Sequence, residues 1–190
     1  MATGGTSASR IIGIDPGNVV TGFGVIEGSS ARPIHVTAGT IRPAAGARGG
    51  VRLLALHQQL LDVIDEYRPA AMSLERSFVA ANVQSAFRLG EARAAAMMAA
   101  AARGLALFEY TPNEVKLTVA GHGHADKAQV KCMVRSALGM GDEMALADDA
   151  SDALAIALCH LLRARVTAAR GAPASIAAPS TKDRLRTGGR

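Results

Sequence analysis

The sequence predicts an α/β protein built on a five-stranded mixed sheet that is flanked by helices. Three observations support this fold class. The chain has 190 residues, and 49% of them are hydrophobic, which is enough to close the core of about one domain. Strand-like segments joined by turn residues occupy residues 10–42, and helix-like and strand-like segments alternate after them.

The first three expected strands form a meander. Pro16 and Gly17 separate the first strand from the second, and Gly28 lies in the turn before the third. Apolar and β-branched residues between such turn signals are typical of strands. We expect these strands at residues 10–15, 19–26 and 33–42.

Helices and strands alternate over the rest of the predicted domain. Leu53, Leu56 and Leu60 fall on one stripe of a helix that ends before Pro69. Gly104 closes a later helix that is rich in alanine. We write the order of the main elements as β-β-β-α-β-α-β-α, with strands at 70–75 and 105–110 and helices at 51–67, 82–104, 128–139 and 148–164.

Composition indicates where the folded domain begins and ends. Residues 1–9 are small and polar, so we expect them to be disordered. From residue 166 the sequence loses its periodicity and gains Pro, Ser and Gly. We therefore expect one domain over residues 10–165 and a flexible basic tail over residues 166–190.

Charge and cysteine usage limit the partners and the compartment. Lysine and arginine total 21 against 16 Asp and Glu, and the net charge of +5 favours a polyanionic partner, although part of the excess lies in the tail. Cys132 and Cys159 lack CxxC spacing, and no signal peptide precedes them, so we expect a cytoplasmic protein without disulfides or zinc. No apolar run approaches the ~18 residues of a spanning helix, and no membrane partner is expected.

Four carboxylates fall at positions where they can meet. By the two-residue period of a strand, Asp15 and Glu75 each end a strand on its less apolar face. Asp149 and Asp152 are three residues apart and project from one side of the last helix. Spacing alone does not choose between Asp149 and Asp148, which also pairs with Asp152 at i,i+4.

Each acid taken singly also fits a structural role, as a turn acid at a strand end or as the cap of a helix. If the four acids converge, they repel one another unless a cation is present. Oxygen ligands without His or Cys suit Mg²⁺ or Mn²⁺. Two such ions about 3.5–4 Å apart are the arrangement that two-metal-ion enzymes use for in-line phosphodiester hydrolysis.

Four stretches within residues 10–165 form a recognisable set: IGIDPGNVVTGFGVI, LERSFVAANVQSAFRLGEARA, FEYTPNEVKLTVAGHGHADKAQV and DDASDALAIALCH. Together they resemble the RuvC family of Holliday-junction resolvases, which have a ribonuclease H-like fold. This resemblance implies that the catalytic and metal-binding acids of a ribonuclease H-like nuclease domain are Asp15, Glu75, Asp149 and Asp152. Asp148 then becomes a neighbour of the site.

The resemblance also implies DNA contacts. Phe78 matches an aromatic residue near the junction centre, where it can stack on an unpaired base, although a loop Phe can also fold back onto the core. Lys116 and Lys127 match basic residues near the active site, although surface lysines are ordinarily just solvated. The family frequently has lysine where this chain has Ala81, and Arg76 or Arg88 can supply that charge.

A histidine pair is the one motif that this scheme does not use. His122 and His124 form an H-x-H loop, but no third ligand is clustered with them in the sequence. This favours a DNA-facing loop over a metal site.

These features predict a metal-dependent endonuclease that binds four-way DNA junctions as a homodimer and nicks two strands symmetrically during recombination and repair. The family implies Mg²⁺, with Mn²⁺ as a substitute, at two ions per subunit. It also implies partners of the RuvA and RuvB type, a junction-binding tetramer and a branch-migration ATPase. The alanine-rich helix at 82–103 suggests a close two-fold interface.

Three other functions compete with this one. The first motif also fits one lobe of an actin-like ATPase, but such enzymes need two lobes to enclose a nucleotide. A ribonuclease H-like nuclease that processes ribosomal RNA shares only the first motif and the D-x-x-D region. A module that binds junctions without cutting them would not need all four acids.

Overall fold

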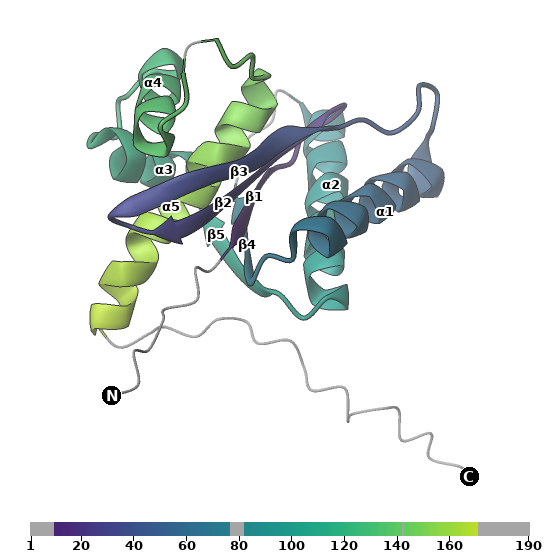
Figure 1. Ribbon diagram of the computed structural model, residues 1–190. Coiled ribbons are helices and arrows are strands. Elements are labelled where there is room, and N and C mark those ends of the chain that lie inside the picture. The colour runs from purple at the N-terminus through teal and green to yellow at the C-terminus, as the bar shows by residue number, and fades with distance from the viewer. Residues whose placement is uncertain (1–9, 77–81, 142, 171–190) are drawn as a thin grey trace, which may run out of the picture.

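The structure is a computed structural model that describes residues 10–76, 82–141 and 143–170 (Figure 1). Within these residues five strands form one sheet in the order β3-β2-β1-β4-β5. The strands are β1 (Ile11–Asp15), β2 (Thr21–Ser29), β3 (Arg32–Ile41), β4 (Ala71–Glu75) and β5 (Ala106–Tyr110). Antiparallel pairing joins β1, β2 and β3, whereas β4 runs parallel to both β1 and β5. The predicted five-stranded mixed sheet is therefore confirmed.

Helices cover both faces of the sheet (Figure 1). In the described part of the chain they are α1 (Gly49–Tyr67), α2 (Val83–Ala102), α3 (Pro112–Ala120), α4 (Lys127–Leu138) and α5 (Asp148–Arg170). One face carries α1 and α2, and the other carries α5 with α3 and α4 beside it. None of these helices combines the length and the apolar character needed to cross a membrane.

The structure contains more helices than the order of main elements predicted from the sequence. Two helices, α3 and α4, lie between β5 and α5. The sequence predicted α4 as a segment, but it did not predict α3. A capping box starts α3: the hydroxyl of Thr111 accepts from the backbone N–H of Glu114, and the Glu114 carboxylate accepts from the backbone N–H of Thr111. The stretch Thr111-Pro112 followed by Glu114 was the available signal, and the short length of the helix hid its periodicity.

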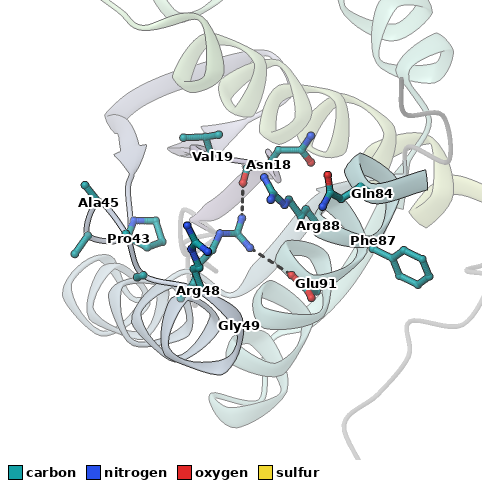
Figure 2. Close-up of a pocket in the computed structure, with 14 residues that line it drawn as sticks. Asn18, Val19, Pro43, Ala45, Arg48, Gly49, Gln84, Phe87, Arg88 and Glu91 are labelled. Atoms are coloured by element: carbon teal, nitrogen blue, oxygen red, sulfur yellow. Dashed lines mark hydrogen bonds and ion pairs between the residues drawn. The ribbon is translucent and has the colours of Figure 1, made fainter. Parts of the chain in front are cut away.

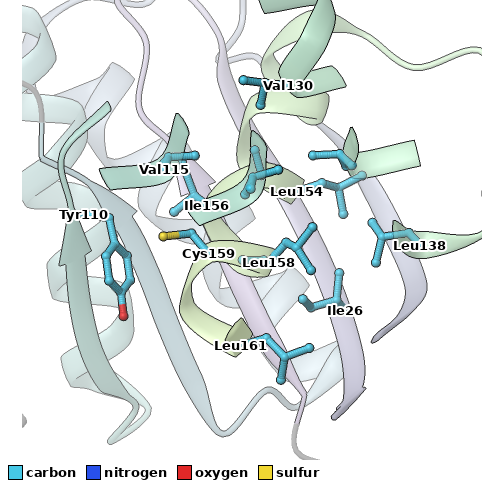
Figure 3. Packing of buried hydrophobic residues seen from close by; sticks show 14 of the residues in the cluster. Ile26, Tyr110, Val115, Val130, Leu138, Leu154, Ile156, Leu158, Cys159 and Leu161 are labelled. Carbon is cyan, nitrogen blue, oxygen red and sulfur yellow. The ribbon is translucent and has the colours of Figure 1, made fainter. Parts of the chain in front are cut away.

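The alternation of side chains along the strands divides the core in two. Ile12, Ile14, Met72 and Leu74 pack against α1 and α2. On the other face, buried side chains of α5 such as Leu154, Ile156 and Leu158 pack against the sheet and against α3 and α4 (Figure 3). The sheet is thus buried on both sides, and polar groups on β1 and β4 concentrate where these strands end.

The last helix is longer than the sequence predicted. It continues to Arg170, so residues 166–170 belong to a helix rather than to the start of the expected tail. Residues 1–9 and 171–190 lie outside the described residues, as do Phe78 and Ala81.

Candidate active site

Asp15 and Glu75 end neighbouring parallel strands. The strands β1 and β4 pair in register as far as Ile14 and Leu74, and each acid is the next residue along its strand. Because Ile14 and Leu74 face α1 and α2, the two acids point to the opposite face, under α5. This is the arrangement that the strand period predicted, and both side chains are half-buried.

Glycine allows α5 to approach these strand ends. Gly22 is the register partner of Asp15 on β2, and a Cβ atom at Gly22 would lie 2.0 Å from the carbonyl oxygen of Asp149. A Cβ atom at Gly13 would lie 2.1 Å from the backbone of the same helix. Any side chain at these positions would push α5 away. The two glycines therefore bring Asp149 and Asp152 to the strand acids, and sequence reasoning had not assigned them this role.

The pKa of Asp15 shows how strongly the four acids act on one another. Burial is the largest cause of its rise from 3.8 to about 8, and the charges of Glu75, Asp152 and Asp149 raise it further. Burial also raises the pKa of Glu75, and the charge of Asp152 adds to the effect. The four carboxylates thus share one region of negative potential, which favours a bound cation.

The structure separates Asp148 from Asp149. The Asp148 side chain is 65% exposed and accepts a hydrogen bond of 3.2 Å from Nζ of Lys131. That bond is the main reason why the pKa of Asp148 lies below its usual value. Asp149 is half-buried, and its charge acts on Asp15. The acid that groups with the strand ends is therefore the one that the family resemblance implied.

A lysine ammonium lies against the acids. Nζ of Lys127 is 2.9 Å from Oδ2 of Asp152 and 3.9 Å from Oδ2 of Asp148. The hydrogen bond to Asp152 is the largest cause of a raised pKa at Lys127. Lys127 therefore stays protonated and offsets part of the negative charge.

The donor set fits a hard divalent cation in its chemistry. Asp15, Glu75, Asp149 and Asp152 offer only carboxylate oxygens, which Mg²⁺ and Mn²⁺ prefer. In residues 10–76, 82–141 and 143–170, no three His, Cys, Asp or Glu side chains are already arranged to hold an ion. His122 and His124 are exposed, and they too belong to no such cluster in this part of the chain.

A cleft of about 270 Å³ adjoins the acids. Glu75 and Asp152 line it together with Lys116 and Lys127, and apolar residues of α3, α4 and α5 form the rest. The two lysines named from the family resemblance thus open onto the same cleft as two of the acids. A phosphodiester in this cleft would meet carboxylate and ammonium groups together.

The predicted arginines lie outside this cleft. Nη2 of Arg76 is 3.9 Å from Oε2 of Glu114, so its charge is partly matched within the protein. Arg88 is exposed on α2 and lines a second, larger cavity. Sequence reasoning missed Arg93, which donates hydrogen bonds to the carbonyl oxygen of Glu75 and to the carboxylate of Glu109. The only sign of Arg93 in the sequence was that it is a charged residue within an alanine-rich helix.

The fold and these acids define a class of protein. A mixed sheet with carboxylates at the ends of β1 and β4 and at the start of α5 is the arrangement of a ribonuclease H-like nuclease. Within that class the chain belongs to the RuvC family, because the model of "Crossover junction endodeoxyribonuclease RuvC" matches residues 11–160. The family's activity, hydrolysis of phosphodiester bonds that resolves Holliday junctions, is therefore the activity of this protein. RuvC enzymes are metal-dependent.

Individual relatives agree with the family match. The RuvC of Geobacter sulfurreducens is 48% identical over 151 residues, which cover 80% of this chain and 91% of the relative. The RuvC of Methylocella silvestris is 43% identical over 178 residues, covering 94% of this chain and 98% of the relative. The match spans the predicted domain, which decides against an actin-like ATPase lobe and against an RNA-processing nuclease.

Solved structures of relatives share the fold. RuvC of Thermus thermophilus in complex with Holliday junction substrate superimposes with a TM-score of 0.78 at 33% identity, over 83% of this chain and 96% of that one. The yeast mitochondrial Holliday junction resolvase Ydc2 superimposes with a TM-score of 0.65 at 14% identity, which shows the fold alone.

Proposed function

We propose that Asp15, Glu75, Asp149 and Asp152 are the catalytic and metal-binding residues of this resolvase. We further propose that they bind Mg²⁺, with Mn²⁺ as a substitute, at two ions per subunit. The observation that carries this proposal is geometric: Asp15 and Glu75 end the neighbouring parallel strands β1 and β4, and Gly22 lets the start of α5, with Asp149 and Asp152, approach them. Four carboxylates in one place suit a pair of hard cations.

The chemistry of this site follows from what each group can do. Bound divalent ions would supply an activated water and a counter-charge for the leaving 3′-oxygen. Asp15 and Glu75 are fixed by strand ends, so little ordering is left for the moment of reaction. Lys116 and Lys127, which line the same cleft as Glu75 and Asp152, would hold the scissile phosphate. The expected products are a 5′-phosphate and a 3′-hydroxyl, which a ligase can join.

The DNA substrate engages further residues in this proposal. The Thermus thermophilus relative has been solved with Holliday junction substrate, and four-way junction DNA is accordingly the substrate proposed here. Arg76 and Arg88 are proposed as backbone contacts, and Arg76 must exchange its partner Glu114 for a phosphate to act as one. Phe78 stays the proposed stacking residue at the junction centre.

We also propose a homodimer that is formed through α2. Most alanines of this helix serve its own sheet, since Ala92, Ala95, Ala96, Ala99 and Ala100 are buried. A separate stripe faces outward: Val83 is 73% exposed, Phe87 is 71% exposed and Met98 is 62% exposed. Exposed apolar residues at helical spacing support a partner surface, and a two-fold axis through α2 would cover them in both subunits. RuvA-type and RuvB-type proteins are the further partners that the family suggests.

Cleavage of a synthetic junction tests the active-site proposal. The protein is incubated with a four-way junction or with linear duplex of the same sequence, in Mg²⁺ or in chelator. We expect cleavage only of the junction and only in Mg²⁺, and we expect Asp15→Asn, Glu75→Gln, Asp149→Asn and Asp152→Asn to abolish it while binding persists. Asp148→Asn is the matched control and should still cut. Cutting at the wild-type rate by two of the four variants would disprove the assignment.

A further inference from the structure

A second cavity of about 690 Å³ lies apart from the cleft that holds the acids (Figure 2). Its walls come from Asn18 and Val19, from the segment 43–49 and from the first half of α2. This volume is within the range of ordinary ligand sites. We call it the arginine cavity, because it is lined by Arg48, Arg52 and Arg88.

The arginine cavity is positively charged. Its lining includes three arginines and one acid, Glu91, which leaves three minus one, or two, positive charges. Nη2 of Arg52 donates to the carbonyl oxygen of Asn18 at 2.6 Å, and its Nη1 lies 3.6 Å from Oε2 of Glu91 (Figure 2). That Nη1 atom is buried and has no hydrogen-bond partner within the described residues. Within the described residues the charge of Arg52 is thus matched only by the 3.6 Å ion pair with Glu91, and the lining of the cavity keeps its net positive charge.

The other two arginines are available to a ligand. Arg48 and Arg88 are exposed, and neither side chain has a hydrogen bond or an ion pair with the residues that the structure describes. Arg48 also precedes α1, which begins at Gly49 without a side-chain cap and without an acid in its first turn. Because Gly49 lines the cavity, the positive end of this helix adds to the arginine charges.

The arginine cavity is close to the proposed active site. Asn18 follows Asp15 by three residues, and an extended chain spans at most ~3.6 Å per residue, so their Cα atoms lie within about 11 Å. Consecutive phosphates of one DNA strand rise by about 3.4 Å along the helix axis. A strand that is bound in the active-site cleft and continues toward this cavity therefore reaches it within a few nucleotides.

We propose that the arginine cavity binds the sugar–phosphate backbone of the DNA within a few nucleotides of the scissile phosphate. This proposal rests on the proposed active site, because the scissile phosphate is the point from which the position of the contact is counted. The cavity suits a phosphodiester rather than a base, because its lining offers guanidinium groups while the ring of Phe87 points away from them (Figure 2). Phosphate contacts of this kind fix the register of a protein on DNA without reading sequence. The cavity would thus select which phosphate reaches the acids.

The first test is the salt dependence of junction binding in chelator. It compares the wild type with the double variant Arg48→Ala/Arg88→Ala and with the control Arg32→Ala. Arg32 is also exposed, but it lies at the start of β3, at the opposite end of the sheet from Asp15. We expect the slope of log K against log salt to become shallower by roughly 1.8 in the double variant, about 0.9 for each phosphate that an arginine no longer neutralises. A slope equal to that of Arg32→Ala would overturn the proposal.

The second test locates the contact. Junctions that carry one neutral methylphosphonate linkage, moved stepwise along the cleaved strand, are titrated with the wild type and with the double variant. A linkage at one position within a few nucleotides of the cleavage site should weaken binding by the wild type and leave the double variant unaffected. Equal weakening for both proteins at every position would overturn the proposal. Cleavage by Asp152→Asn would instead contradict the active-site assignment alone, since neither binding measurement depends on cleavage.

Discussion

The pKa of Asp15 is raised from 3.8 to about 8, so this carboxyl group releases its proton far less readily than an exposed one. Burial at the strand end and three neighbouring carboxylates keep the proton in place. Binding of a divalent ion at this position requires that proton to leave, so metal affinity rises with pH. The position of Asp15 at the strand end thus determines its pKa, and this pKa affects the affinity of the proposed metal site.

The first prediction follows from the direction of this shift. The folded pKa of about 8 lies above the ordinary value of 3.8, so the folded state holds the proton of Asp15 over a pH range in which the unfolded chain has released it. In chelator, the contribution of Asp15 to the free energy of unfolding should therefore fall as pH rises from about 4 to about 8, by a few kcal/mol. Buried His160, whose pKa is lowered to about 4, acts in the opposite direction between about pH 4 and 6.5, so the contribution of Asp15 is measured as the difference between the wild type and Asp15→Asn in urea denaturation at several pH values.

The control for this prediction is Asp62→Asn, which changes an exposed acid on α1. It should keep the wild-type dependence of stability on pH. If Asp15→Asn kept that dependence too, the carboxyl group of Asp15 would not be the group that titrates.

The second prediction concerns the lysines. Lys127 contacts Asp152 and opens onto the cleft beside the acids, whereas the ammonium of Lys131 bonds to the exposed Asp148. Lys127→Ala should lower the cleavage rate and reduce the salt slope of junction binding by about 0.9, as expected when one phosphate is no longer neutralised. Lys131→Ala should leave both quantities near the wild type. Equal effects of the two variants would show that only general positive charge matters.

At the scale of elements, the period of the strands predicted much of the site, whereas the approach of α5 could not be predicted. The alternation in β1 and β4 was sufficient to place Asp15 and Glu75 on one face. The distance between α5 and the sheet depends on Gly13 and Gly22, and a glycine in a strand pattern can equally indicate a bulge or a bend. Only the packed structure shows that these glycines face a helix backbone.

The third prediction tests this close approach. A methyl group at Gly22 would meet the Asp149 carbonyl oxygen at 2.0 Å, so Gly22→Ala must displace α5 or β2. A displacement of about 1 Å can lower catalysis by ~10²-fold, and we expect a loss of that order in the cleavage rate while junction binding persists. Gly50→Ala is the matched control, since a Cβ atom there meets nothing within 4 Å, and it should cut normally.

Circular dichroism at the assay temperature ensures that Gly22→Ala is compared as a folded protein. If the folded variant cut at the wild-type rate, the position of α5 would not limit the reaction.

At the scale of the whole molecule, the sequence predicted features that are encoded within one short segment and did not predict sites that are formed by distant segments. The five strands, and the position of Asp15 and Glu75 at the ends of two of them, follow from periodicity and turn signals within short segments. The arginine cavity brings together Asn18 from the loop after β1, Arg52 from α1 and Arg88 from α2, and no spacing rule relates them. The two faces of α2 were equally hidden, because a run of alanines does not reveal which of them pack inward.

The last prediction concerns assembly, because two like strands must be cut and a two-fold dimer supplies two identical sites. The outward stripe of α2 is the proposed interface, and a charge there would be buried without a partner. Phe87→Asp should therefore sediment as a monomer at concentrations where the wild type is a dimer. Leu117→Asp is the matched control, since Leu117 is 54% exposed on α3, on the opposite side of the sheet, and should remain dimeric.

The same two-fold model predicts how mixed dimers act. A dimer of one wild-type and one Asp152→Asn subunit has one proposed active site, so on a supercoiled cruciform plasmid it should produce nicked circles and very little linear product. The ratio of nicked to linear plasmid on a gel measures this directly. As much linear product from mixed dimers as from the wild type would contradict the model, and so would full junction resolution by Phe87→Asp under conditions where it sediments as a monomer.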